Sequence, residues 1–234
     1  MHSNSYTLWY AIVSTAIVAV ILAVAASSLR PMQERNVAEA KRAAILQSVM
    51  EVDPSTLERD YNSFISERVF DAQGQELPSV SAFDLDLKKE MRLAPQERNY
   101  PLYLFTRDGE VKYIIPLQGK GLWGPITAFV ALESDGNTIF GVVFEHEKET
   151  PGLGAEISTS GFQERFRGKT FFGDDGSFQS VRILKGSGHD VSDEAHQVDG
   201  LTGATMTLNG VNAMLSDGIS RYESILSGIK SQPR

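Results

Sequence analysis

The sequence predicts an α+β protein with one N-terminal transmembrane helix, followed by a domain in which helices pack on an antiparallel sheet. Three observations predict this class: an uncharged apolar stretch near the N-terminus, two hairpin patterns rich in β-forming residues, and an apolar helical stripe at the C-terminal end. They divide the chain into a transmembrane helix at 1–30, a juxtamembrane helical segment at 31–98 and a folded domain at 99–234.

The composition sets limits on the function. The chain has 234 residues, of which 41% are hydrophobic and 22% charged, as is typical of a globular domain with a core. With 22 Lys and Arg against 30 Asp and Glu, its formal charge is -8, and without a basic cluster a nucleic-acid partner is not expected. The chain has no cysteine, which excludes disulfides, thiolate nucleophiles and cysteine-bound metal clusters.

The apolar stretch at 8–29 contains 22 uncharged residues. As a helix it would be about 33 Å long at roughly 1.5 Å per residue, which matches a membrane core of about 30 Å. A cleavable signal peptide is the alternative, but no Lys or Arg precedes the stretch and it is longer than a signal-peptide core. Basic residues follow it, and by themselves they would place the folded domain in the cytoplasm: Arg30, Arg35, Lys41 and Arg42.

Helical patterns are expected in the segment that follows. Residues 33–50 have helical composition, and Asp53 with Pro54 predicts the start of another helix, because a carboxylate can cap the first amides and proline is tolerated at the first position. The apolar stripe of this second helix is Leu57, Tyr61, Phe64 and Ile65.

The remaining elements belong to the predicted sheet and its cover. Residues 100–106 and 111–116, joined through Asp108 and Gly109, predict one hairpin, and residues 128–132 and 138–144 predict another. A further strand is expected at 181–184. A long closing helix carries a stripe with steps of three or four: Leu208, Val211, Leu215, Ile219, Tyr222, Leu226 and Ile229.

The most informative motif is DGLTGAT at 199–205, directly before the closing helix. Two glycines in a turn would bring a threonine hydroxyl to a helix N-terminus, where unpaired amides and the helix dipole stabilise a phosphate. The alternative is that the threonine and aspartate only cap the helix.

This motif resembles the flavinylation motif of the FMN-binding domains in the C subunit of bacterial sodium-translocating NADH:quinone reductases and in the G subunit of Rnf electron-transport complexes. The match covers every fixed position, with Asp199, Thr202, Gly203, Ala204 and Thr205 in order. The resemblance implies that Thr205 is esterified by FMN, which a flavin transferase takes from FAD with release of AMP. It gives Asp199 a role in recognition or positioning, although a plain turn carboxylate is an equal alternative.

Two further segments resemble the same family. In the first, EHEKETPGLGAEI at 145–157, the resemblance implies that Glu149, Thr150, Gly152 and Leu153 line the flavin pocket. The alternatives are that Glu149 is only a solvated charge and that the whole segment only connects a strand to a helix.

The second segment is GKGLWGPI at 119–126, where Leu122 and Trp123 would pack against the isoalloxazine ring, unless Trp123 is ordinary core. Lys185 would meet polar flavin atoms or phosphate, unless it is a solvated surface lysine. The motif register argues against Thr207 as the acceptor.

The resemblance is strongest to the C subunit of the sodium-translocating reductase, and it implies a membrane-anchored electron relay that passes electrons toward quinone. Its partners would be the other subunits of a multisubunit complex and, during maturation, the flavin transferase. The location would be the bacterial inner membrane, with the domain in the periplasm. The G subunit of a Rnf complex and an anchored binding or assembly module without flavin are the alternatives.

Four histidines, His2, His146, His189 and His196, lack the spacing of a metal site, and no dinucleotide-binding fingerprint is present.

Overall fold

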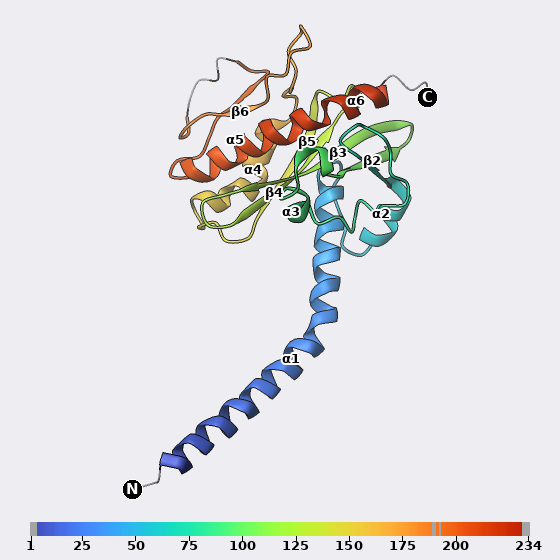
Figure 1. Ribbon diagram of the computed structural model, residues 1–234. Helices are drawn as coiled ribbons and strands as arrows, with labels where there is room; N and C mark the ends of the chain where they lie inside the picture. Colours follow the sequence, from blue (N-terminus) through green and yellow to red (C-terminus); the bar gives the residue numbers. More distant parts are fainter. Residues whose placement is uncertain (1–3, 189–190, 192, 231–234) are drawn as a thin grey trace. The chain divides into compact units, whose positions relative to one another are not determined.

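The computed structural model describes residues 4–188, 191 and 193–230, and the chain separates into one compact unit that ends at Arg42 and another that begins at Ala43. The first unit contains most of helix α1 (Asn4–Gln47), which has the length and composition of a membrane span (Figure 1). The last residues of this helix, from Ala43, belong to the second unit. The helix predicted at 33–50 is not separate, because α1 continues through Pro31 to Gln47. Ion pairs one turn apart, Arg30 with Glu34 and Arg35 with Glu39, support the helix beyond the proline.

The second unit is built on a five-stranded antiparallel sheet in which the strands follow one another in chain order. The strands are β1 (Ile65–Phe70), β2 (Tyr100–Arg107), β3 (Glu110–Lys120), β4 (Pro125–Leu132) and β5 (Ile139–His146). Both predicted hairpins are confirmed. Asp108 and Gly109 have φ angles of 52° and 84°, as the tight two-residue turn between β2 and β3 requires.

Strand β1 differs from the helical character expected between 31 and 98. Helix α2 (Leu57–Phe64) begins later than Pro54 and ends before Ile65, which opens β1 and pairs with Phe105. The local apolar spacing around Ile65 fits a helix. Ile65 nevertheless lies in a strand, because it pairs with Phe105, 40 residues further along the chain. Two short helices follow, α3 (Leu87–Glu90) and η1 (Pro95–Glu97).

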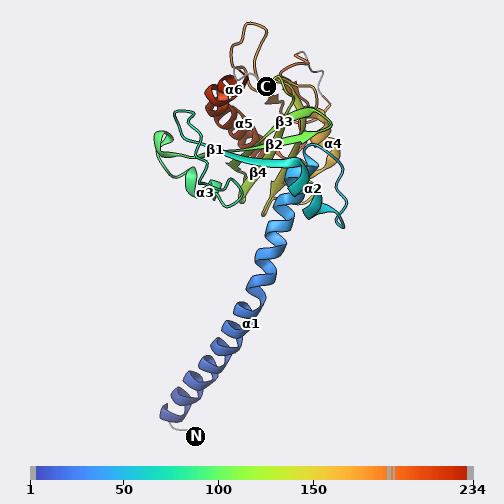
Figure 2. The ribbon, with the colours of Figure 1, turned by 90° about the vertical axis from the view of Figure 1, so that its right-hand side faces the viewer.

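The sheet has a core on each face. On one face it packs against α5 (Thr205–Ile219), which continues as η4 (Ser220–Tyr222) and α6 (Glu223–Lys230) (Figures 1 and 2). The predicted stripe of the closing helix is confirmed at its six positions from Leu208 to Leu226, while the side chain of Ile229 lies outside the described part. The other face packs against Ala44, Ile45 and Leu46 at the end of α1 and against Tyr61 of α2.

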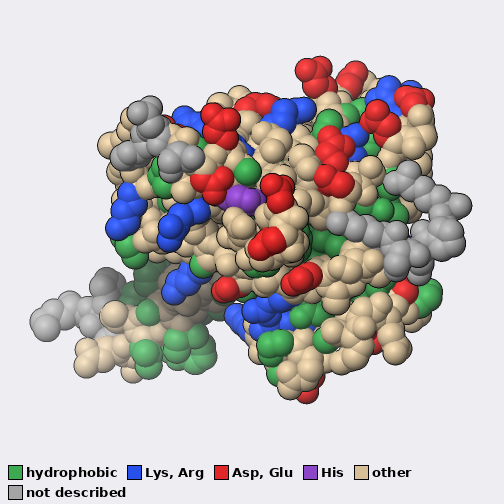
Figure 3. Space-filling model, turned by 90° about the horizontal axis from the view of Figure 1, so that it is seen from above, with side chains coloured by type: hydrophobic (Ala, Val, Ile, Leu, Met, Phe, Trp, Pro, Cys, Tyr) green, Lys and Arg blue, Asp and Glu red, His purple; other side chains and the backbone are tan. Residues whose placement is uncertain are grey.

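The chain between the sheet and α5 forms short elements. These are η2 (Gly154–Ser158), α4 (Ser160–Gln163), η3 (Glu164–Phe166) and the parallel pair β6 (Arg182–Ile183) and β7 (Gln197–Val198). The side-chain amide of Asn212 on α5 accepts from the Ile183 amide and donates to its carbonyl, which fastens β6 to the helix. Seen from above, the molecule carries acidic and basic side chains together on its surface (Figure 3). The predicted fold class is confirmed.

Candidate functional site

Thr205 is the first residue of α5. Gly203, two residues earlier, has a φ angle of 78°, a left-handed conformation that favours glycine. The N-cap position is held by Ala204, and no side chain caps the helix. The first amides of α5 therefore have no intrahelical partner. The interpretation of this motif as a simple helix cap is wrong, because Thr205 lies inside the helix.

The turn before α5 is held by residues that the sequence did not indicate. Nη1 of Arg165 donates to the carbonyl oxygens of Asp199 at 3.0 Å and Gly200 at 2.9 Å. The carboxylate of Asp199 accepts from the amide of Gly188 at 2.8 Å, and the hydroxyl of Thr202 lies 2.8 Å from that of Ser187. Both side chains thus bind the preceding loop. Arg165 is 34 residues from Asp199, so no local spacing could have identified it.

Glu149 is a buried carboxylate with only 4% of its surface exposed. Its Oε1 accepts from the backbone amide of Trp123 at 2.8 Å, and its Oε2 accepts from the hydroxyl of Thr207 at 2.5 Å. Burial pushes the pKa of Glu149 up, but these bonds, a further one from the Gly124 amide and the neighbouring His146 together hold the pKa below its usual range. The carboxylate is therefore ionised, and the interpretation as a solvated charge is wrong.

The loop that carries Glu149 closes in a tight turn. The carbonyl of Thr150 accepts from the amides of Leu153 and Ala155, both at 3.1 Å, and Gly152 has a φ angle of 75°. This turn brings Leu153 to Gly203, where a side chain on Gly203 would collide with Cδ2 of Leu153. The loop therefore lies against the turn that precedes Thr205.

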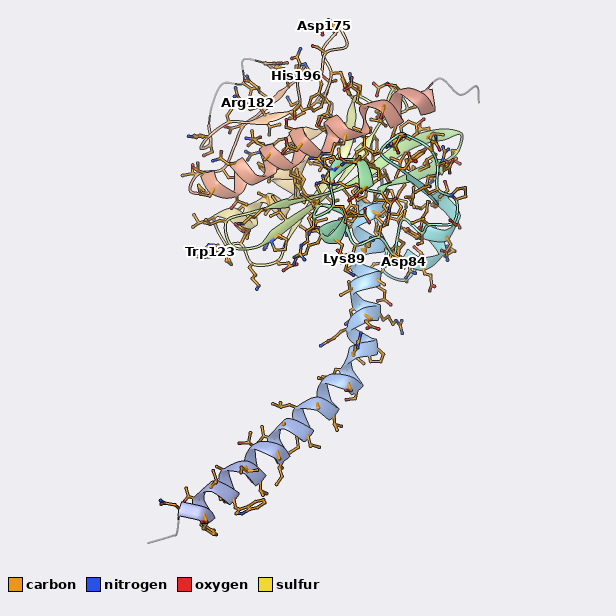
Figure 4. All side chains as sticks on the ribbon, in the orientation of Figure 1. Asp84, Lys89, Trp123, Asp175, Arg182 and His196 are labelled. Carbon is orange, nitrogen blue, oxygen red and sulfur yellow. The ribbon has the colours of Figure 1, made fainter. Side chains whose placement is uncertain are left out.

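Four large apolar side chains remain exposed where these segments meet, and we refer to them as the apolar rim. They are Leu122 at 48% exposure, Trp123 at 64%, Leu153 at 42% and Met206 at 59%. Trp123 is therefore not a core residue, and it lies at the edge of the domain (Figure 4). Met206 was missed by the sequence reasoning, since a methionine at the second position of a helix carries no signal of its own. All four belong to segments that Glu149 and Leu153 bring together, and exposed apolar side chains on such segments suit a binding surface.

Lys185 lines a different part of the surface from the one where Trp123 lies. It lines a hollow together with Arg182, His196 and Asn209. Figure 4 shows Arg182 and His196 separated from Trp123 by α5. In the part of the chain that the structure describes, no group of three or more histidines or carboxylates could hold a metal ion, and His2 and His189 lie outside that part.

The comparisons with known proteins agree with this geometry. The model of the FMN-binding domain family matches residues 121–220, from the loop of Trp123 to the end of α5. The C subunit of the Na(+)-translocating NADH-quinone reductase of Neisseria meningitidis serogroup A is 32% identical, covering 98% of this chain and 95% of that protein. The chain belongs to this C-subunit family. The C subunit of the same reductase from Pseudomonas aeruginosa is 33% identical, with 97% of both chains covered.

A solved structure of the C-subunit family supports the same conclusion. The crystal structure of the Parabacteroides distasonis protein, the C subunit of its Na(+)-translocating NADH-quinone reductase, is 39% identical and has a TM-score of 0.77. The match covers 88% of this chain and 98% of that one. The resemblance to the C-subunit family is therefore confirmed.

The residues at the start of α5 fit an FMN group. The free amides of the first helical turn suit a phosphate, and the apolar rim suits the faces of an aromatic ring system. Thr205, the first residue of α5, is half-buried.

Proposed function

We propose that this chain is the electron-transfer subunit of a sodium-translocating NADH:quinone reductase and carries FMN through a phosphoester bond to Thr205. Thr205 is assigned as the acceptor because two nearby threonines differ in their exposure to solvent. Thr205 is half-exposed, whereas Thr207 is 2% exposed and donates to Glu149. Side chains two residues apart on a helix point about 200° apart, so only one of them faces solvent.

The attachment needs FAD and a flavin transferase as partners. Oγ of Thr205 forms a bond to the phosphorus of the FMN half, the bond from that phosphorus to the AMP oxygen breaks, and the hydroxyl proton is released. The amides of the first turn of α5 stabilise the negative charge of the resulting phosphodiester. Asp199 and Thr202 hold the turn through Gly188 and Ser187, so their proposed role is to position Thr205.

FMN supplies one-electron redox chemistry, and the protein positions it and shields it from water. We assign the shielding to the apolar rim and the loop around Thr150 and Gly152. Electrons would enter from other subunits of the complex and leave toward quinone. The chain has no cysteine, so it cannot supply the thiolate ligands of a metal–sulfur cluster. All three relatives described above are C subunits of the sodium-translocating reductase, which favours this branch over the G subunit of a Rnf complex.

We further propose that α1 anchors the chain in the bacterial inner membrane, with the folded domain in the periplasm. The basic residues after the span oppose this orientation, but large domains are translocated largely regardless of nearby charge. Because the chain has no cysteine, Asp175→Cys would place one thiol on an exposed loop. A membrane-impermeant maleimide should label it in spheroplasts, and labelling only after lysis would overturn the orientation.

Intact mass after coexpression with a flavin transferase tests the attachment. The denatured chain should carry one FMN, Thr205→Val should remove it, and Thr56→Val, whose hydroxyl donates to Asp60 far from the motif in the sequence, should retain it. If the flavin stays on Thr205→Val, the assignment is wrong. If no flavin is attached to the unaltered chain, the proposed relay is wrong as well.

A further inference from the structure

The contacts of Glu149 extend across three parts of the chain. Its Oε1 accepts from the loop at 121–124 through the Trp123 amide, and its Oε2 accepts from the first turn of α5 through Thr207. Glu149 itself belongs to the loop after β5, 58 residues before Thr207. A single carboxylate therefore connects both loops of the apolar rim to the helix that begins at Thr205.

At two glycines the backbone comes so close to the Glu149 carboxylate that a side chain there would collide with it. A Cβ on Gly121 would lie 2.5 Å from Oε1 of Glu149. A Cβ on Gly154 would lie 2.6 Å from Oε2 and would also collide with the hydroxyl of Thr207. Close approach of backbone to a polar group is a structural reason for glycine. The two loops and the carboxylate thus form one tightly packed unit.

The ionised carboxylate of Glu149 is stable in its buried position only while hydrogen-bond donors surround it, because a buried charge without hydrogen bonds is strongly disfavoured. The hydroxyl of Thr207 is a donor whose position is set by the helix, since it lies in the first turn of α5. Its bond to Glu149 therefore determines where that turn lies relative to the two loops. Thr205 belongs to the same turn.

We propose that Glu149 and Thr207 are positioning residues for the attachment of flavin at Thr205. Their hydrogen bond holds the first turn of α5 against the loops, so that the Thr205 hydroxyl is presented beside the apolar rim in one fixed orientation. Neither residue reacts with the flavin. This inference rests on the proposed function and adds to it the part of the protein that prepares the acceptor.

The test compares rates of flavin attachment to the full chain in detergent, with purified flavin transferase and FAD. Thr207→Val keeps the shape of the side chain and removes the donor. It should slow attachment roughly ten- to a hundredfold, since misplacing a reacting group by about 1 Å has a cost of this order. Thr207→Ser keeps the donor and should restore most of the rate. Glu149→Gln removes the charge at the same shape and should also slow attachment.

A matched control lies far from the site in the sequence. The hydroxyl of Thr56 donates to Oδ2 of Asp60 at 2.5 Å, the same kind of bond at the same length. Thr56→Val should leave the rate of attachment unchanged. Hydrogen exchange of the chain before attachment gives a second readout, because amides at 121–124 and 147–154 should exchange faster in Thr207→Val than in Thr56→Val.

The possible outcomes separate this inference from the function on which it rests. Flavin attachment to the unaltered chain with an equal rate for Thr207→Val overturns the inference alone. A slow Thr56→Val, or a Thr207→Ser that restores nothing, shows a general loss of stability and also overturns it. No attachment to the unaltered chain overturns both. If Thr207→Val does not fold, the Glu149→Gln variant decides, and an unchanged rate there contradicts the inference.

Discussion

Nη1 of Arg165 lies 2.9 Å from the carbonyl oxygen of Gly200 and 3.0 Å from that of Asp199, so one guanidinium holds the backbone of the DGLTGAT motif. A Cβ on Gly200 would collide with the carbonyl of Leu184, which shows how closely this turn packs on the chain beside it. The turn is thus held from two sides.

Replacing Arg165 should loosen this turn. Arg165→Ala should lower the free energy of unfolding by about 1–2 kcal/mol, because hydrogen bonds from a charged group contribute in that range and this side chain is partly exposed at 36%. It should also slow flavin attachment. Arg59→Ala, which removes an ion pair with Asp60 made by a side chain that is 72% exposed, should change stability by less than about 0.5 kcal/mol. Thermal unfolding of both variants checks the difference, and equal shifts would contradict it.

Glycine substitutions should distinguish required from permissive positions. Gly203→Ala should cost about 1–2 kcal/mol because an L-residue is strained at positive φ, and its Cβ would meet Leu153. Gly154→Ala should cost about 1–3 kcal/mol through overpacking against Thr207 and Glu149. Gly161→Ala, whose Cβ would meet nothing within 4 Å, should be within about 0.5 kcal/mol of the unaltered chain. Urea unfolding followed by circular dichroism measures all three.

Trp123 should matter to the flavin and little to the fold. Because 64% of its surface is exposed, Trp123→Ala should change the stability of the chain before attachment by less than about 0.5 kcal/mol. Phe144→Ala, in the core at 1% exposure, should cost about 3–5 kcal/mol. After attachment, Trp123→Ala should increase flavin fluorescence, because a nearby indole quenches it. Unchanged fluorescence would place the ring system away from Trp123.

Glu145 should make stability depend on pH. It pairs across the sheet with Thr127, and burial raises the pKa of its carboxyl above the ordinary 4.5. Because the folded pKa is the higher one, folding favours the protonated acid, and this contribution is lost as the pH rises from 4.5 through the folded pKa.

Glu145→Gln should therefore be more stable than the unaltered chain at pH 7, because burial disfavours the charged carboxylate of Glu145 and glutamine carries no charge. The advantage should vanish below pH 4.5, where both folded and unfolded carboxyls are protonated. Glu147→Gln, at an exposed position, is the control and should show no such trend. Urea unfolding at both pH values measures the effect, and a constant advantage would contradict the assignment.

Much of the fold could be predicted from local sequence patterns. The apolar stretch, both hairpins and the buried stripe of the closing helix follow from spacing and turn chemistry, because these depend on neighbours within a few residues. Strand β1 could not be recognised in this way, since Ile65 continues a helical stripe and only its pairing with Phe105 makes it a strand. The continuity of α1 through Pro31 was likewise not visible, because a proline ordinarily favours a break.

At the site, the sequence by itself determined the motif, the family it resembles and the threonine that the register selects. The tertiary structure alone decided that Thr205 is partly exposed, that Thr207 is buried against Glu149 and that Arg165 holds the turn. Burial and hydrogen bonding between segments 34 to 58 residues apart depend on how the chain folds back on itself, which no local spacing encodes.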